Sequence, residues 1–289
     1  MGRRMDSRFC GNDKLIQLFL NECIAQGKAP AMNVIAKENT AKIPFVADAG
    51  VGARARIGLI VLASDQTIEH EFRLLLNLPD VAIFESRIYN DNDIRPDTLR
   101  AMEGGIAPAT RLILPGERLD VVGFGCTSAS MLLGEATIGA RIREARPGIA
   151  FTTPVTGTFA GLRAFGAQRI AVLTPYADEV NAGIRSYIEQ HGFAVAAMGS
   201  FKEPDDRIVA RISPDSIVAA ATQLVEGSGA EALFVSCTSL RLAERVAELE
   251  ARIGIPATSS NHAMAWHSLR LAGIADVRPE FGKLFTLQA

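Results

Sequence analysis

Two short strings in the sequence carry residue types that can do chemistry on a small molecule: Cys126-Thr127-Ser128 and Cys237-Thr238-Ser239. A cysteine can act as a nucleophile, and a thiol and a thiolate together can donate and accept a proton. The hydroxyls and backbone N–H groups that follow each cysteine suit a bound carboxylate. Two thiols that face one small substrate therefore predict acid–base or nucleophilic chemistry without a cofactor.

Each string follows an apolar run of strand length and precedes a segment with helical periodicity. The two runs cover residues 119–125 and 231–236. A cysteine at a helix N-terminus lies at the positive end of the helix dipole, which predicts a lowered thiol pKa. A lone buried cysteine is usually inert packing. The repeat of one string in one context in both halves of the chain favours a function for the pair.

Strands and helices alternate along the chain from residue 56 onward, which indicates parallel α/β units. Predicted strands cover residues 57–62, 81–84 and 119–125 in a first pass and 169–174, 193–197 and 231–236 in a second. Predicted helices cover residues 67–76, 96–113, 126–143, 159–165, 177–190 and 214–226. The fold class is therefore α/β, with two pseudo-symmetric lobes. Each lobe is a short parallel sheet flanked by helices, and the active-site cleft lies between the lobes.

The domain prediction follows from these two passes. Residues 54–153 together with 259–289 form the first lobe, and residues 154–258 form the second. Residues 1–53 are an N-terminal extension with no predicted function, and they hold Cys10 and Cys23. Two local features are also predicted. Gly104, Gly105 and Pro108 bend or break the helix over 96–113, and residues 203–207 form a loop.

Ligands of open α/β sheets bind beyond the carboxyl ends of the strands. Besides the two strings, the polar residues at these ends are Ser64, Asp65, Gln66, Thr174, Tyr176, Ser259, Ser260 and Asn261. Several have an equally good structural explanation. Asp65 could simply cap the following helix, and Tyr176 could pack a turn. Asp205 and Asp206 lie in a charged loop, and such loops are usually solvated.

The remaining sequence features exclude several classes of protein. The 289 residues carry a net charge of −2 without a basic run, so neither nucleic acid nor a membrane surface is an expected partner. No apolar run reaches about 18 residues, and four cysteines do not make a disulfide framework. The four histidines have no metal-ligand spacing, and for His262 and His267 packing is favoured over catalysis. We expect a cytoplasmic protein that binds neither a metal nor a nucleotide.

Three motifs in order resemble the Asp/Glu racemase superfamily, in the branch of the maleate cis–trans isomerases and arylmalonate decarboxylases. They are the paired Cys-Thr-Ser strings, Thr174-Pro175-Tyr176 and the string Ser-Ser-Asn-His-Ala at 259–263. The resemblance covers residues 56–285. It implies an isomerase that needs no pyridoxal phosphate, with Cys126 and Cys237 as catalytic residues. It also implies substrate contacts from Thr127, Ser128 and Tyr176. Arylmalonate decarboxylases keep only the second cysteine, so two cysteines weigh against decarboxylation.

Two departures from this family concern the substrate. Maleate isomerases carry asparagine where this chain has Asp65, and another family asparagine corresponds to Asp206. An asparagine amide donates hydrogen bonds to a substrate carboxylate, whereas an ionised aspartate can only accept them. Two carboxylates in contact repel each other, or one takes up a proton. Asp65 suits a substrate ammonium instead, and the string at 62–71 resembles the ectoine-utilisation proteins of the family.

The sequence thus predicts a cofactor-independent isomerase of a small dicarboxylate or an amino acid. It either isomerises an alkene of the maleate type or racemises an acidic or ectoine-derived amino acid. Thr238 and Ser239 are added to the predicted substrate-binding residues by their place in the second string. The alternatives are an arylmalonate-type decarboxylase and a non-catalytic protein that binds a small carboxylate. Enzymes of this type often form homodimers, and the sequence does not decide the oligomeric state.

Overall fold

The computed structural model describes residues 43–91 and 95–289. Cys10, Cys23 and most of the predicted N-terminal extension lie outside the described residues. Residues 48–289 form one compact unit, which holds every element described below. Among the residues described, no helix combines the length and the apolar character that a membrane crossing requires.

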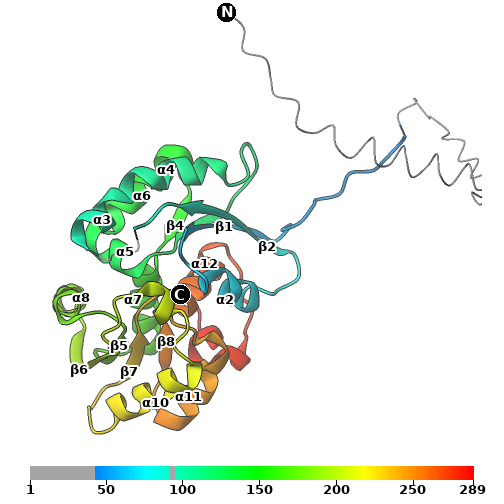
Figure 1. Cartoon of the computed structure of the whole chain (residues 1–289). Helices are drawn as coiled ribbons and strands as arrows, with labels where there is room; N and C mark the ends of the chain where they lie inside the picture. The colour runs from blue at the N-terminus through cyan, green and yellow to red at the C-terminus, as the bar shows by residue number, and fades with distance from the viewer. Residues whose placement is uncertain (1–42, 92–94) are drawn as a thin grey trace, which may run out of the picture. The chain divides into compact units, whose positions relative to one another are not determined.

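The core of this unit consists of two parallel four-stranded sheets (Figure 1). The first sheet has the order β2-β1-β3-β4 and the second has the order β6-β5-β7-β8. The first-sheet strands are β1 (Ala55–Leu62), β2 (Val81–Ile88), β3 (Val121–Phe124) and β4 (Ala150–Thr152). The second-sheet strands are β5 (Arg169–Thr174), β6 (Ala194–Ser200), β7 (Ala232–Val235) and β8 (Ala257–Ser259). Matching strand orders confirm the predicted α/β fold, whereas the residue limits of the two lobes stay a prediction.

Helices flank both sheets (Figure 1). The first half of the chain has α2 (Ile68–Leu75), α3 (Pro96–Ala101), α4 (Glu103–Leu112), α5 (Thr127–Leu133), α6 (Glu135–Ala145) and α7 (Pro154–Phe165). The second half has α8 (Asp178–Gln190), α9 (Asp206–Val209), α10 (Pro214–Val225), α11 (Val246–Ile253) and α12 (Ser260–Leu271). The short 3₁₀ turn η1 (Ala243–Arg245) lies directly before α11. The 3₁₀ turns η2 (Pro279–Phe281) and η3 (Lys283–Thr286) lie after α12.

Strand β1 shows why the sheets form. Its apolar run is buried on both faces, as a central parallel strand requires. Ile57 packs in a cluster with residues of α2 and α12, and Ile60 packs in another cluster with residues of α4 and α6. Because side chains alternate between the two faces of a strand, helices must cover both sides of this sheet.

The structure corrects the predicted helix over 96–113. The break lies at Met102, between α3 and α4, and Pro108 sits inside α4. The proline ring displaces the carbonyl four residues earlier, which belongs to Gly104. An added Cβ at Gly104 would meet no atom within 4 Å, so this turn has room to adjust.

Other differences involve short or interrupted elements. The helix predicted over 126–143 is divided into α5 and α6 at Gly134, whose φ of 79° a helix cannot contain. The predicted loop over 203–207 includes the first residues of α9. Strands β4 and β8 are three residues long, too short to give an alternating pattern in the sequence.

Two helices follow the last strands of the two sheets in equivalent positions. Helix α7 follows β4 of the first sheet and leads to β5, and α12 follows β8 of the second sheet. Both begin at a side-chain cap: Thr153 accepts from the N–H of Thr156, and Ser259 accepts from the N–H of His262. The helices cross closely at Gly157, where an added Cβ would lie 2.7 Å from the carbonyl oxygen of Ala263.

We expect Gly157→Ala to lower the free energy of unfolding by about 1–3 kcal/mol, because the methyl group would push α7 and α12 apart. The matched control is Gly183→Ala in α8, where an added Cβ would meet nothing within 4 Å. That variant should stabilise the protein by up to about 1 kcal/mol, since alanine favours helix more than glycine does. Urea unfolding of both variants measures the difference. Equal stabilities would contradict this account of the crossing.

Candidate active site

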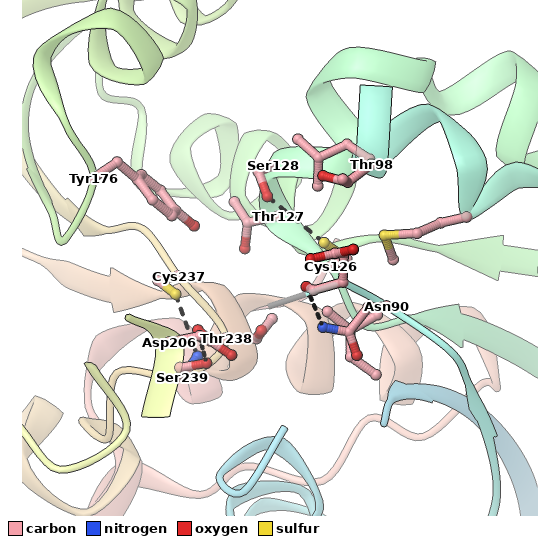
Figure 2. A pocket seen from close by; sticks show the side chains of 14 residues that line it. Asn90, Thr98, Cys126, Thr127, Ser128, Tyr176, Asp206, Cys237, Thr238 and Ser239 are labelled. Atoms are coloured by element: carbon pink, nitrogen blue, oxygen red, sulfur yellow. Dashed lines mark hydrogen bonds between the residues drawn. The ribbon is translucent and has the colours of Figure 1, made fainter. Parts of the chain in front are cut away.

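One cavity is lined by both Cys-Thr-Ser strings (Figure 2). It measures about 40 Å³. The predicted site residues in its wall are Cys126, Thr127, Ser128, Tyr176, Asp206, Cys237, Thr238 and Ser239. The rest of the wall consists of Leu62, Asn90, Asp91, Thr98, Leu99 and Met102. Of the predicted site residues, Asp65 alone is absent from the wall.

Cys126 is held by hydrogen bonds within its own segment. It follows β3 and is the N-cap residue of α5, as the sequence predicted. Its Sγ accepts from the backbone N–H of Ala129 at 3.4 Å and lies 3.7 Å from the hydroxyl of Ser128. The thiol is therefore fixed at the carboxyl end of β3, with only 4% of the residue exposed.

Cys237 is held differently, and the predicted helix after it is absent. The chain runs from β7 through an irregular loop to the 3₁₀ turn η1 at Ala243. The φ of Cys237 is 155°, a value that residues with side chains rarely adopt and that often marks functional sites. Its Sγ accepts from the N–H of Ser239 at 3.4 Å. The two strings share a sequence and differ in backbone structure.

The expected lowering of the thiol pKa values is wrong for this structure. Burial raises the pKa of Cys126 to about 11 and that of Cys237 to about 12. Hydrogen bonds to the sulfur atoms oppose these shifts, and the negative charge of Asp206 adds to both. Removal of the thiols from water outweighs the local hydrogen bonds, because a thiolate is charged and a thiol is not.

Asp206 is one of two aspartates in the cavity wall, with Asp91. It begins α9, and its two oxygens accept from the hydroxyls of Ser239 at 2.7 Å and Ser64 at 3.4 Å. Burial raises the pKa of its carboxyl group. Its neighbour Asp205 instead caps α9 and pairs with Arg207, so the charged loop contains one solvated and one cavity-lining aspartate.

Tyr176 reaches the cavity from the turn after β5. Its carbonyl accepts from the amide of Asn181 at 2.8 Å and from the hydroxyl of Ser200, which anchors the turn. The phenol is buried, and burial raises its pKa well above the usual value. A neutral phenol can donate a hydrogen bond to a sulfur atom or to a substrate oxygen.

Asp65 lies beneath the cavity and is 3% exposed. One carboxylate oxygen accepts from the backbone N–H groups of Thr67 at 2.7 Å and Ile68 at 2.8 Å, which caps the start of α2. Burial raises the pKa of Asp65 to about 6. The geometry thus matches the helix-cap explanation of Asp65, and Asp206, not Asp65, lies in the cavity wall.

Asn90 is a polar cavity residue that the sequence did not reveal. The predicted second strand ended at residue 84, whereas β2 continues to Ile88 and places Asn90 directly after it. The Asn90 side chain accepts from the N–H of Ser64 at 3.1 Å and donates to its hydroxyl at 2.8 Å. Had the strand been predicted to extend to residue 88, Asn90 would have been found as a polar residue beyond the carboxyl end of a strand.

Outside the cavity, the two histidines have packing roles, as predicted. His262 is fully buried and bonds with the hydroxyl of Thr258 and the carbonyl of Phe281. His267 bonds with the hydroxyl of Thr152. Burial lowers the pKa of both to about 4. Within the ranges 43–91 and 95–289, no cluster of residues suited to a metal ion occurs.

A pair of parallel sheets with a cysteine at the carboxyl end of a strand in each defines a protein of the Asp/Glu racemase superfamily, in its maleate isomerase and arylmalonate decarboxylase branch. The model of the arylmalonate decarboxylase family matches residues 92–285, and the chain belongs to this family.

Relatives of two kinds are similar to the chain. Arylmalonate decarboxylase from Bordetella bronchiseptica is 31% identical over 170 residues, which are 57% of this chain and 70% of the relative. Maleate isomerase from Nocardia farcinica is 29% identical over 244 residues, which are 79% of this chain and 94% of the relative.

Solved structures of the same two kinds have a similar fold. A Nocardia farcinica maleate cis–trans isomerase mutant with a covalently bound succinylcysteine intermediate has a TM-score of 0.74 and 25% identity. The similarity covers 80% of this chain and 98% of that one. Unliganded arylmalonate decarboxylase has a TM-score of 0.67 and 27% identity, with 80% and 99% covered.

We expect Asp206→Asn to speed the alkylation of both thiols by iodoacetamide at pH 8, by about tenfold if each thiol pKa falls by about one unit. Removal of the carboxylate charge lowers these pKa values and so raises the thiolate fraction. Mass spectrometry of the peptides around Cys126 and Cys237 measures each rate. The control is Asp205→Asn, which keeps a capping side chain outside the cavity. Unchanged rates in Asp206→Asn would show that its charge does not act on the thiols.

Proposed function

We propose that this protein is a cysteine-dependent isomerase that racemises a small carboxylate carrying a nitrogen group. The observation that carries the proposal is the pair of thiols in one cavity. Figure 2 shows Cys126 and Cys237 on different sides of that cavity, with Tyr176 and Asp206 on the side of Cys237. The similarity to maleate isomerases supports an isomerase, and the succinylcysteine structure supports cysteine chemistry in this family.

The proton steps follow from this arrangement. One cysteine, as thiolate, removes the proton from the carbon next to the substrate carboxylate and leaves a planar enediolate. The other cysteine, as thiol, returns a proton to the opposite face of that carbon. The two residues exchange protonation states in each turnover, so no other proton donor is needed.

Neutral hydroxyl groups supply the contacts for the substrate carboxylate. Ser128 comes from one string and Thr238 from the other, whereas the hydroxyl protons of Thr127 and Ser239 are already donated to Ser260 and Asp206. The Tyr176 phenol can also donate a hydrogen bond into the cavity. Among the residues described, the cavity wall contains no lysine, arginine or histidine. A dianionic substrate would therefore lack a charged partner here.

Asp206 favours a substrate with an ammonium or another nitrogen donor. A bound ammonium neutralises the charge of Asp206, which otherwise raises the pKa of both thiols. Such a substrate therefore helps to form the thiolate that attacks it. A second carboxylate in the same place would have the opposite effect. An acidic amino acid or an acylated diaminobutyrate, the ectoine-derived class, meets this requirement.

Cis–trans isomerisation is the second candidate, and the maleate isomerase relatives favour it. In that reaction one thiolate adds to an alkene carbon of maleate. The new single bond rotates, and elimination of the thiolate gives fumarate. The arylmalonate decarboxylase relative supports a third reaction that uses a single thiol. The proposals differ in substrate and in the number of cysteines that they require.

Purified protein should exchange the α-hydrogen of an amino-acid substrate for deuterium in D₂O and racemise it. The panel contains both enantiomers of aspartate, an acylated diaminobutyrate, maleate and a phenylmalonate. NMR measures exchange and chiral chromatography measures racemisation. Cys126→Ala and Cys237→Ala should each lower racemisation by about 10²–10⁴-fold, because each removes one proton carrier. A Cys126→Ala variant with full activity on the phenylmalonate would reject the racemase in favour of the decarboxylase.

Asp206→Asn should change the preferred substrate. We expect kcat/KM for the amino acid to fall by about 10-fold or more, the loss of about 1.4 kcal/mol from one charge–charge contact. Activity on maleate should rise, because an amide can donate to its second carboxylate. Steady-state kinetics on both substrates measure the change. A wild-type protein that already prefers maleate, with no gain in Asp206→Asn, would reject the nitrogen-bearing substrate.

A further inference from the structure

The loop that carries Cys237 is buried although it has no regular secondary structure. Between β7 and η1, Ser239 is 2% exposed, Leu240 is 0% exposed and Leu242 is 1% exposed. Buried backbone N–H and C=O groups need partners, and a strand or helix is not available to provide them here. The partners come from two helices that are distant in sequence, α12 and α2.

Helix α12 holds the first part of the loop through its first two residues. The N–H of Cys237 donates to the hydroxyl of Ser260 at 3.0 Å, and the carbonyl of Thr238 accepts from the amide of Asn261 at 2.7 Å. The Ser260 oxygen also accepts from the hydroxyl of Thr127 at 2.9 Å. One buried hydroxyl therefore contacts both Cys-Thr-Ser strings.

Helix α2 holds the rest of the loop, mainly through Glu71. One carboxylate oxygen of Glu71 accepts from the N–H groups of Leu242 and Ala243, both at 2.7 Å. The other oxygen accepts from the Asn261 amide at 2.8 Å. Thr67, at the start of α2, donates its hydroxyl to the carbonyl of Ser239 at 3.1 Å.

Glu71 is an unusual residue for a helix face that packs against a core. It is 2% exposed, and its hydrogen-bond partners are neutral amides. Burial raises the pKa of its carboxyl group to about 7, and the nearby charge of Asp65 adds to this shift. Burial of a carboxylate is costly, and these hydrogen bonds offset the cost. Glu71 thereby supplies the acceptors that the loop backbone and Asn261 need.

We propose that Glu71 is a positioning residue for Cys237. Glu71 directly fixes the end of the Cys237 loop at Leu242 and Ala243. It fixes the start of the loop through Asn261, which donates to the carbonyl of Thr238. A backbone value such as the φ of Cys237 persists only where the surroundings impose it, and this network imposes it. Cys126 has hydrogen bonds within its own segment and does not depend on Glu71.

The test compares the reactivities of the two thiols in full-length Glu71→Gln. The glutamine oxygen can still accept from Leu242 and Ala243, but its NH₂ group faces the donor of Asn261. The Asn261 amide must then turn, and the carbonyl of Thr238 loses its donor. We expect iodoacetamide to alkylate Cys237 about fivefold faster or more, because a looser loop admits water and favours the thiolate. The rate at Cys126 should stay within about twofold.

Glu250→Gln is the matched control. Glu250 also accepts from two backbone N–H groups, those of Ala257 and Lys283, and is partly buried. It lies on α11 and makes none of these hydrogen bonds with the Cys237 loop. It should therefore leave both alkylation rates unchanged. Equal acceleration of both thiols in Glu71→Gln, or the same change in Glu250→Gln, would overturn the proposal.

A second variant and a kinetic measurement complete the test. If Glu71→Gln does not fold, Glu71→Asp keeps the charge on a shorter side chain that cannot span the loop and Asn261. It should show the same selectivity for Cys237, and a rate at Cys237 equal to wild type would overturn the proposal. The expected effect on turnover rests on the proposed function. In the proposed reaction, the Glu71 variants should have a lower kcat and a nearly unchanged KM. The alkylation rates need no substrate, so failure of the proposed reaction would leave the positioning result intact.

Discussion

Desolvation of two thiols next to a carboxylate is the constraint on which this site depends. Burial alone makes Cys126 and Cys237 poor acids, and Asp206 makes them poorer. Both raised pKa values favour the neutral thiols at neutral pH, and under the proposed function a substrate ammonium beside Asp206 lowers them. A buried thiol pair of this kind is protected from reaction with most solutes. Under the proposed function, the thiols react only when the substrate is bound in the cavity.

The two cysteines occupy equivalent places in the duplicated fold, but different contacts hold them in position. Cys126 is held by neighbours in sequence, so its segment carries its own geometry. Cys237 is held by residues from α2 and α12 that lie far away in the chain. Helix α2 covers the first sheet, so the geometry of the second thiol depends on the packing of the first lobe. The duplication provides two thiols, and hydrogen bonds between the halves of the chain hold the second thiol in place.

Much of this could be predicted from the sequence, for local reasons. Apolar runs that end in Cys-Thr-Ser located both thiols, since strand ends converge at one edge of a parallel sheet. Three failures share a different cause. Asn90 was missed because β2 is longer than its apolar part, and the helix after Cys237 was predicted without knowledge of Glu71 and Asn261. The thiol pKa was predicted from the helix dipole, while burial, a property of the whole fold, decides it.

The crossing of α7 and α12 at Gly157 constrains how the cavity can admit a ligand. Helix α7 connects β4 to β5, α12 follows β8, and backbone lies against backbone where the two helices cross. Figure 1 shows both helices between the sheets, at the centre of the fold. If this contact persists while a ligand enters, the movement that widens the cavity would be a rotation of the sheets about the crossing, and it would change the separation of Cys126 and Cys237.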